Sequence, residues 1–181
     1  MKKYISYKNS QEKWLGQIPS HWCEAYLQTV CDEKRNINVN NEVSLVLSLS
    51  YGKVIRKRDI YAGLVAKDFR TYQIVEPNDI ILRFTDLQND HKSLRTGLVQ
   101  EKGIITAAYT CITSSSNAAY LHYILHSYDV KKVFYGLGGG VRQSIGFKDI
   151  RYLFLPIPPR DEQDQIVRFL DWKVSSINRL I

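Results

Sequence analysis

Hydrophobic and polar residues alternate along parts of the first half of the chain. In the segment 44–51, SLVLSLSY, three leucines and Tyr51 fall on one side and three serines on the other. A period of two is typical of a half-buried strand, and Gly52, which follows directly, predicts a turn. Further strands are expected where short apolar stretches end at turn residues, namely at 72–75, 79–85, 103–113 and 152–158.

A longer, helical period appears in two other places. Between residues 22 and 30, the larger apolar side chains stand at roughly helical spacing, which predicts a short amphipathic segment. From Ser116 onward the pattern predicts a longer helix, because Ser116 or Asn117 can cap its first turn. The buried stripe of that helix is expected to consist of Leu121, Ile124, Leu125 and Tyr128.

The last segment, DEQDQIVRFLDWKVSSINRLI, predicts a helix of a different kind. Asp161, Glu162 and Asp164 occupy its first turn, where the helix dipole favours negative charge. At 1.5 Å per residue the helix is a rod of roughly 30 Å, and no Gly or Pro stop precedes its end. We expect it to await a partner helix, with an apolar stripe formed by Ile166, Leu170, Val174, Ile177 and Leu180.

Together these elements predict an α+β fold. Its domain is expected to contain a mixed or antiparallel sheet with flanking helices over residues 1–159. The C-terminal helix then projects from that domain over residues 160–181. A chain of 181 residues is long enough for one such domain with its own core.

The charge balance favours a polyanionic partner. Twenty-five Lys and Arg against 18 Asp and Glu give a formal charge of +7, and nucleic acid is the commonest partner of such a protein. A charge that only aids solubility is the alternative. The three cysteines form no paired motif, which suits a reducing cytoplasm, and no apolar run approaches the ~20 residues that cross a membrane.

Motifs that would carry catalysis are weak in this sequence. His122 and His126 stand at metal-chelating spacing, but Tyr123 occupies the place of a zinc hydrolase's base, and two histidines on a solvated face explain the pair better. Asp79 could begin a nuclease pattern that DVK at 129–131 completes, although Asp-x-Lys occurs twice more in the chain. We therefore expect no catalytic residue, no metal site and no cofactor.

A glycine-rich segment, GLGGGVRQS at 136–144, also lacks the features of a nucleotide-binding loop. A phosphate loop needs a buried strand before it and a helix with a Lys-Ser or Lys-Thr pair after it. Here the end of a helix precedes the glycines, and Val141 and Arg142 follow them. The segment therefore needs another explanation.

Six stretches taken in order resemble one target-recognition domain of the specificity subunit of type I restriction–modification systems. The resemblance runs from about Trp14 to the C-terminus, and its sharpest part is the close, where Pro-x-Pro-Pro precedes Glu162, Gln163 and an apolar helix. The six stretches are WLGQIPSHW, LSLSYGKVIRK, DIILRFTDLQND, SLRTGLVQEKGIIT, GGGVRQSIGFKDI and LPIPPRDEQDQIVRFLD.

This resemblance implies a non-catalytic module that recognises double-stranded DNA in the cytoplasm. In that family a subunit carries two recognition domains whose long helices pack together, while separate methyltransferase and restriction subunits use S-adenosylmethionine and ATP. This chain holds one such domain and the start of one helix. It is expected either to be a fragment or to pair with a second copy of itself through residues 160–181, as a homodimer.

Two segments are the expected DNA-binding surfaces. In the glycine-rich segment the backbone can approach DNA closely, and in the segment 83–95 amide side chains suit adenine while basic ones suit guanine or phosphate. The candidate residues are Arg83, Gln88, Asn89, Lys92, Arg95, Gly139, Gly140, Arg142, Gln143 and Ser144. For each segment a plain connecting loop is the alternative, and the basic run 53–58 is either a third DNA surface or a protected edge strand.

Two other functions stay open at this level. One is a self-contained nuclease or methyltransferase whose active site has no recognisable motif. The other is a scaffold that acts through its terminal helix, with incidental basic charge. A purified chain that neither cuts DNA with magnesium nor transfers methyl groups would favour the DNA-binding interpretation.

Overall fold

A four-stranded antiparallel sheet forms the centre of the molecule. The computed structural model describes residues 4–57, 68–87, 90, 92–137 and 145–179. The sheet has the order β4-β11-β8-β9, so that β11 and β8 lie in the middle and β9 at an edge. Its strands are β4 (Cys31–Lys34), β8 (Asp79–Leu82), β9 (Thr96–Leu98) and β11 (Thr110–Ser114).

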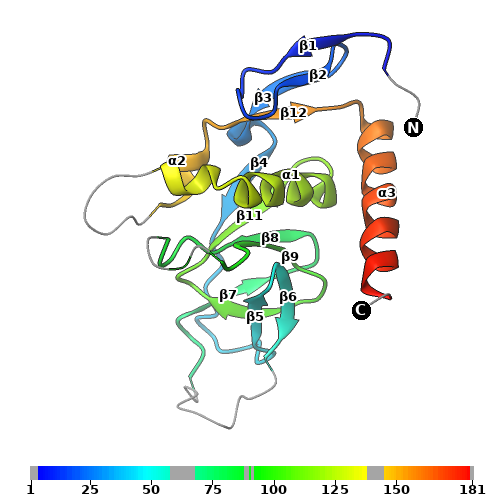
Figure 1. Ribbon diagram of the computed structural model, residues 1–181. Helices are drawn as coiled ribbons and strands as arrows, with labels where there is room; N and C mark the ends of the chain where they lie inside the picture. The colour runs from blue at the N-terminus through cyan, green and yellow to red at the C-terminus, as the bar shows by residue number, and fades with distance from the viewer. Residues whose placement is uncertain (1–3, 58–67, 88–89, 91, 138–144, 180–181) are drawn as a thin grey trace.

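The other strands form four antiparallel pairs around this sheet (Figure 1). The pairs are β1 (Tyr7–Asn9) with β2 (Gln17–Pro19), β3 (Cys23–Tyr26) with β12 (Phe154–Ile157), β5 (Leu47–Ser50) with β6 (Lys53–Arg56), and β7 (Tyr72–Val75) with β10 (Gly103–Thr106). The helices are η1 (Leu27–Thr29), α1 (Ala118–Val130), η2 (Val133–Gly136), α2 (Phe147–Ile150) and α3 (Arg160–Asn178).

Helix α1 covers the sheet and builds the main core. Asn117 caps it, because the side-chain Oδ1 accepts a hydrogen bond from the backbone N–H of Tyr120 at 3.0 Å. Of the predicted stripe, Leu121, Leu125 and Tyr128 are buried in one cluster with residues of β8 and β11, and Ile124 is partly buried against that cluster. This arrangement and the flanking helices confirm the α+β class.

Several predicted strands are confirmed, and one helical prediction is wrong. The range 103–113 holds two strands instead of one, because the chain turns between Thr106 and Thr110. The segment expected to be helical near Trp22 forms β3 and the short η1, because β3 pairs along its whole length with β12. A pairing partner some 130 positions away along the chain cannot be inferred from local spacing, since backbone pairing overrides propensity.

Helix α3 stands at one side of the molecule as a separate rod, at the right of Figure 1. Its first turn is anchored to the N-terminal part of the chain, because the Glu162 carboxylate accepts hydrogen bonds from Trp22 Nε1 at 2.8 Å and contacts His21 Nε2 at 2.6 Å. Gln163 donates to the carbonyl of Pro158 at 2.9 Å. In the part of the chain that the structure describes, no helix is long and apolar enough to cross a membrane.

Candidate nucleic-acid interface

Arg95 lies at the centre of the segment 83–95 and is 0% exposed. Its guanidinium donates hydrogen bonds to the carbonyls of Thr85 at 2.8 Å and Arg83 at 3.2 Å, and also to those of Asp86 and Asp90. Arginine's fixed fork of donors suits this task, since it satisfies several inward-facing carbonyls at once. The expectation that Arg95 contacts DNA is therefore corrected: the side chain is committed to holding this segment in shape.

The same arginine joins the segment 83–95 to the entrance of the glycine-rich segment. Arg95 Nε donates to the Tyr135 hydroxyl at 2.9 Å, and that hydroxyl lies 3.1 Å from the carbonyl of Asp90. Tyr135 belongs to η2, which leads directly toward residues 138–144. The segment 83–95 and the helical turn that precedes the glycine-rich segment are thus attached to one buried side chain.

Asp90 orders the basic residues around it. Its carboxylate accepts backbone hydrogen bonds from Ser93 at 2.9 Å and Lys92 at 3.2 Å, and pairs with Arg83 Nη2 at 3.2 Å. Hydrogen bonds from Ser93, ahead of those from Lys92 and the charge of Arg95, lower the pKa of Asp90 to about 2. Arg83 is therefore half-buried and paired, whereas the Lys92 side chain is exposed.

A third basic segment, the hairpin of β5 and β6, packs against the segment 83–95 through its turn. Tyr51 and Gly52 both have positive φ, of 46° and 75°, as a tight two-residue hairpin turn requires. A Cβ placed on Gly52 would lie 3.2 Å from Leu94 Cδ1, so the turn packs closely against the segment 83–95. Of the basic residues on this hairpin, Arg56 pairs with Glu101 at 2.7 Å, and Lys53 is exposed.

The alternation at 44–51 predicts Tyr51 on the apolar side of a strand, and that prediction is wrong. Leu47 and Leu49 are buried as expected, but the strand ends at Ser50 and leaves Tyr51 in the turn, 88% exposed. The glycine directly after Tyr51 could have indicated the exposure of Tyr51, because a two-residue hairpin turn takes both of its central residues out of the strands. Tyr51 thereby joins Lys53 and Lys92 at the exposed surface of the candidate interface.

Many of the expected contact residues fall in stretches that the structure leaves undescribed. They are Gln88, Asn89, Gly139, Gly140, Arg142, Gln143 and Ser144. Arg95 contacts described residues close to both stretches, namely Asp86 and Asp90 on one side and Tyr135 on the other. The described part of the candidate interface therefore consists of the buried Arg95 and the exposed side chains of Tyr51, Lys53 and Lys92.

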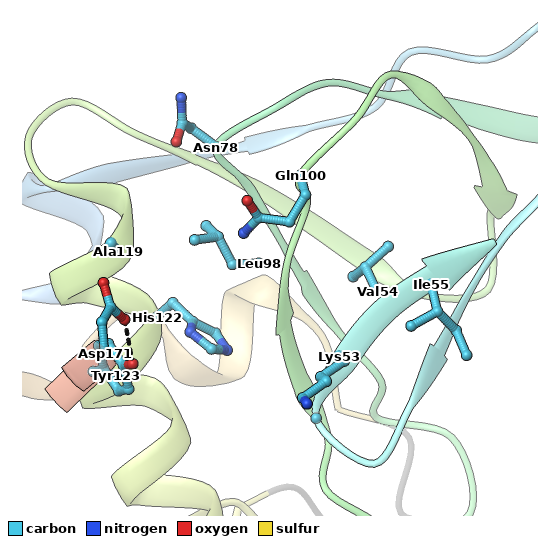
Figure 2. Close-up of a pocket in the computed structure, with 11 residues that line it drawn as sticks. Lys53, Val54, Ile55, Asn78, Leu98, Gln100, Ala119, His122, Tyr123 and Asp171 are labelled. Carbon is cyan, nitrogen blue, oxygen red and sulfur yellow. Dashed lines mark hydrogen bonds between the residues drawn. The ribbon is translucent and has the colours of Figure 1, made fainter. Parts of the chain in front are cut away.

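A groove of about 520 Å³ borders this interface between β6, β9, α1 and α3. Figure 2 shows Lys53 on one side of it, with His122 and Tyr123 of α1 on the other, where Tyr123 donates a hydrogen bond to Asp171 of α3 at 2.6 Å. The two histidines of α1 are half-buried, so the expectation of a solvated face is wrong. Burial, followed by the nearby His126, lowers the pKa of His122 to about 4, so its ring is neutral at pH 7.

The carboxylates of the nuclease pattern have other partners. Asp79 is buried, pairs with Lys34 Nζ at 2.7 Å and accepts the backbone N–H of Glu76 at 2.8 Å. Asp129 is also buried, and its carboxylate accepts the backbone N–H of Arg95 at 2.6 Å. Among the described residues, no three His, Cys, Asp or Glu side chains gather closely enough to hold a metal ion.

The apolar side chains of α3 remain largely uncovered. Within the described part of α3, Gln163 is the one buried residue, and no α3 side chain belongs to the apolar core clusters. Ile166 and Leu170 are half-buried, and Leu180 lies outside the described residues. The exposed apolar residues are Phe169 at 41%, Trp172 at 56%, Val174 at 41% and Ile177 at 54%.

Comparison with known proteins gives a consistent match at the level of structure. No protein-family model matches the chain, and no curated protein matches it by sequence. A chain from a structure of a type I restriction–modification system superposes with a TM-score of 0.62 at 17% identity over 90% of this chain. The HsdS subunit from Thermoanaerobacter tengcongensis gives 0.54 at 18% identity over 90%, and the type I S subunit from M. genitalium gives 0.56 at 13% identity over 88%.

These matches establish that the chain has the fold of type I restriction–modification specificity subunits. The aligned region covers 40%, 40% and 41% of the three matched chains, so this chain spans about two fifths of their length. The resemblance expected from the sequence motifs is thus confirmed for the fold.

Proposed function

We propose that this chain is a sequence-specific recognition module for double-stranded DNA in a type I restriction–modification complex, without catalytic activity of its own. The observation that carries the proposal is that the β5–β6 hairpin packs against Leu94, while η2, which precedes the glycine-rich segment, is hydrogen-bonded to Arg95 of the same basic segment 83–95. A formal charge of +7 and the fold of known specificity subunits support the same conclusion. The match to specificity subunits does not favour the alternative of a self-contained nuclease or methyltransferase. The two carboxylates of the nuclease pattern, Asp79 and Asp129, are committed to structural contacts.

The residues of the interface have different proposed roles in binding DNA. Arg95 shapes the surface from inside, and the exposed Lys53 and Lys92 suit phosphate oxygens, which fix position but carry no sequence information. Sequence choice belongs to side chains that can pair with base edges. For that task we propose Gln88 and Asn89, together with Arg83 once DNA displaces Asp90, and Gln143 and Ser144 beside Gly139 and Gly140, where the backbone can approach DNA. We propose that Arg142 contacts phosphate.

Binding to a labelled duplex of mixed sequence tests this proposal. Affinity should fall steeply with salt, and Lys92→Ala should reduce the salt slope by about one released counterion for all sequences alike. Arg142→Ala should likewise weaken binding to all sequences alike, because Arg142 is proposed to contact phosphate. Lys13→Ala, at an exposed lysine outside the interface, is the matched control and should change neither affinity nor slope.

Selection of bound duplexes from a random pool tests the sequence-reading part. Gln88→Ala should relax the preference at one position, by about 1–3 kcal/mol if a bidentate pair is lost. A wild-type chain that binds all duplexes equally, with and without a methyltransferase subunit, would contradict sequence-specific recognition. Cleavage with magnesium that disappears in Asp79→Ala would instead establish the nuclease alternative.

We further propose that residues 1–159 form the recognition domain and that residues 160–181 begin a helix for assembly. The exposed apolar residues of α3 support this, since each large apolar side chain left in water forgoes about 1.5–3 kcal/mol. The proposed partners are a methyltransferase subunit, and through it a restriction subunit, or a second copy of the chain. The place of action that follows from this role is the cytoplasm.

Sedimentation over a range of concentrations, with and without a methyltransferase subunit, tests the assembly proposal. Wild type should self-associate or bind that subunit. The double variant Leu170→Asp, Ile177→Asp should stay folded and lose the association. A chain that remains monomeric at high concentration and has no affinity for the methyltransferase subunit would contradict it.

A further inference from the structure

Tyr51 is an aromatic side chain held away from the protein at a costly backbone position. It is 88% exposed, whereas Leu47 and Leu49 of the preceding strand β5 are buried. Its φ of 46° lies in the left-handed region, where a bulky side chain is a genuine outlier. The described residues with positive φ other than glycine are Asn41, Tyr51, Asn78, Asp86 and Lys132, and Tyr51 is the aromatic one.

Folding alone gives no reason for a tyrosine here. Asn, Asp or Gly would adopt the same turn with less strain, because these residues tolerate left-handed backbone. An exposed ring also gains little from burial. A residue that the fold does not favour, in a conformation that the surrounding structure must impose, points to a task outside folding.

The surroundings of the turn indicate what that task is. Gly52 packs against Leu94 on one side, so the turn is fixed on the segment 83–95 and only the Tyr51 side chain stands free. Lys53 follows two positions later and is exposed, and Lys92 is an exposed cation on the segment against which the turn rests. An amphipathic ring beside cations suits the surface of duplex DNA, where deoxyribose and thymine methyl groups are apolar and the phosphates are negatively charged.

We propose that Tyr51 enters a groove of duplex DNA, with its ring against deoxyribose and base edges, while Lys53 contacts the neighbouring phosphate. This inference rests on the proposed DNA-binding function and adds a contact residue to it. The left-handed turn holds the ring in its outward position before DNA arrives. Less ordering is then needed on binding, which is the physical benefit of a preformed contact.

The variant Tyr51→Asn tests the proposal, because it keeps a residue that accepts left-handed backbone and removes the ring. Its melting temperature should stay equal to wild type or rise by about 2–4 °C as strain is relieved. Its affinity for a labelled 30-bp duplex of mixed sequence should fall about tenfold. Stability and affinity that move in opposite directions separate a contact residue from one that supports the fold.

Tyr7→Asn is the matched control, since Tyr7 is also an exposed tyrosine but lies on β1, at the other end of the molecule from the β5–β6 hairpin (Figure 1). It should leave affinity unchanged. A photoreactive phenylalanine derivative at position 51 should crosslink to the duplex, and the same group at position 7 should not. Wild-type affinity in Tyr51→Asn, or no crosslink at position 51 in a chain that binds DNA, overturns the inference alone. A wild-type chain that binds no duplex overturns the proposed function and this inference together.

Discussion

Helices α1 and α3 follow the same apolar period but have opposite surroundings. In α1, four apolar or aromatic side chains are buried, namely Tyr120, Leu121, Leu125 and Tyr128. In the described part of the longer α3, the one buried residue is a glutamine, Gln163. The comparison teaches that a helical stripe shows that one face is apolar, while the rest of the fold decides whether anything covers it.

The contacts that attach the two helices to the rest of the molecule also differ. Leu125 of α1 lies within the main core, and the Tyr120 hydroxyl donates to the carbonyl of Pro156 at 2.8 Å. Helix α3 is held by polar contacts, among them the Glu162 anchor and the hydrogen bond from Tyr123 to Asp171. Helix α1 is therefore part of the core, whereas α3 lies on the surface of the molecule and is held there by polar contacts.

The largest effect should come from truncating a buried residue of α1. Leu125→Ala removes a fully buried side chain and should lower the free energy of unfolding by about 2–5 kcal/mol. Val174→Ala in α3 is the matched control and should cost less than about 1 kcal/mol, because Val174 is exposed. Urea denaturation measures both. Equal losses would break the comparison, since they would show that α3 is covered in the free chain.

A smaller loss is expected at Arg95, which α1 helps to hold through Asp129. Arg95→Met leaves buried carbonyls without donors and should lower the free energy of unfolding by about 2–4 kcal/mol. Lys92→Met, three positions earlier and exposed, should change it by less than about 0.5 kcal/mol. If Arg95→Met is as stable as wild type but loses DNA binding, Arg95 is a contact residue and its structural assignment is wrong.

The regular elements were predictable because their patterns are local. The alternation around Leu47 and Leu49, the turn at Gly52 and the Asn117 cap each depend on neighbouring residues, and all are confirmed. The segment near Trp22 was not predictable, because β12 lies far along the chain. Local pattern cannot show which distant strand a segment will pair with.

The candidate interface was predictable as a set of segments but not as a surface. Its basic and amide residues are visible in the sequence, yet the burial of Arg95 depends on Tyr135 and on carbonyls that only the folded chain brings inward. The exposure of Tyr51 likewise depends on where its strand ends. Charge identifies candidates, whereas contacts decide which of them face outward.

An intermediate effect is expected from pH, at a residue where α1 and α3 approach each other. The pKa of His122 is lowered from 6.5 to about 4, so the unfolded chain takes up a proton before the folded one. This contribution to stability is present above pH 6.5 and is lost as the pH falls from 6.5 to 4. The loss should be on the order of 1–2 kcal/mol, allowing for a side chain that is not fully buried.

Urea denaturation of wild type and His122→Gln at pH 7.5 and pH 5 measures this contribution. The difference between the two proteins should depend on pH, because glutamine cannot take up the proton. Carboxylates titrate alike in both proteins and cancel in the comparison. The same pH dependence in both would show that His122 is protonated as easily in the folded chain as in the unfolded one.

The smallest effect concerns the hydrogen bond that joins the two compared helices. Tyr123→Phe removes the hydroxyl that donates to Asp171 at 2.6 Å and leaves the ring in place. The contact is partly solvated, so its loss should weaken the attachment of α3 by about 0.5–1 kcal/mol. The stability of the core should not change. Amide hydrogen exchange should therefore quicken by about two- to fivefold in the second half of α3, while α1 stays as slow as in wild type. Tyr152→Phe, at an exposed tyrosine whose ring contacts Tyr26 and Arg151, is the matched control and should alter neither helix. Unchanged exchange in Tyr123→Phe would place the whole attachment of α3 at its first turn, where Trp22 and His21 hold Glu162. A measurable loosening would instead show that α1, besides building the core, sets the direction in which α3 presents its apolar side chains to a partner.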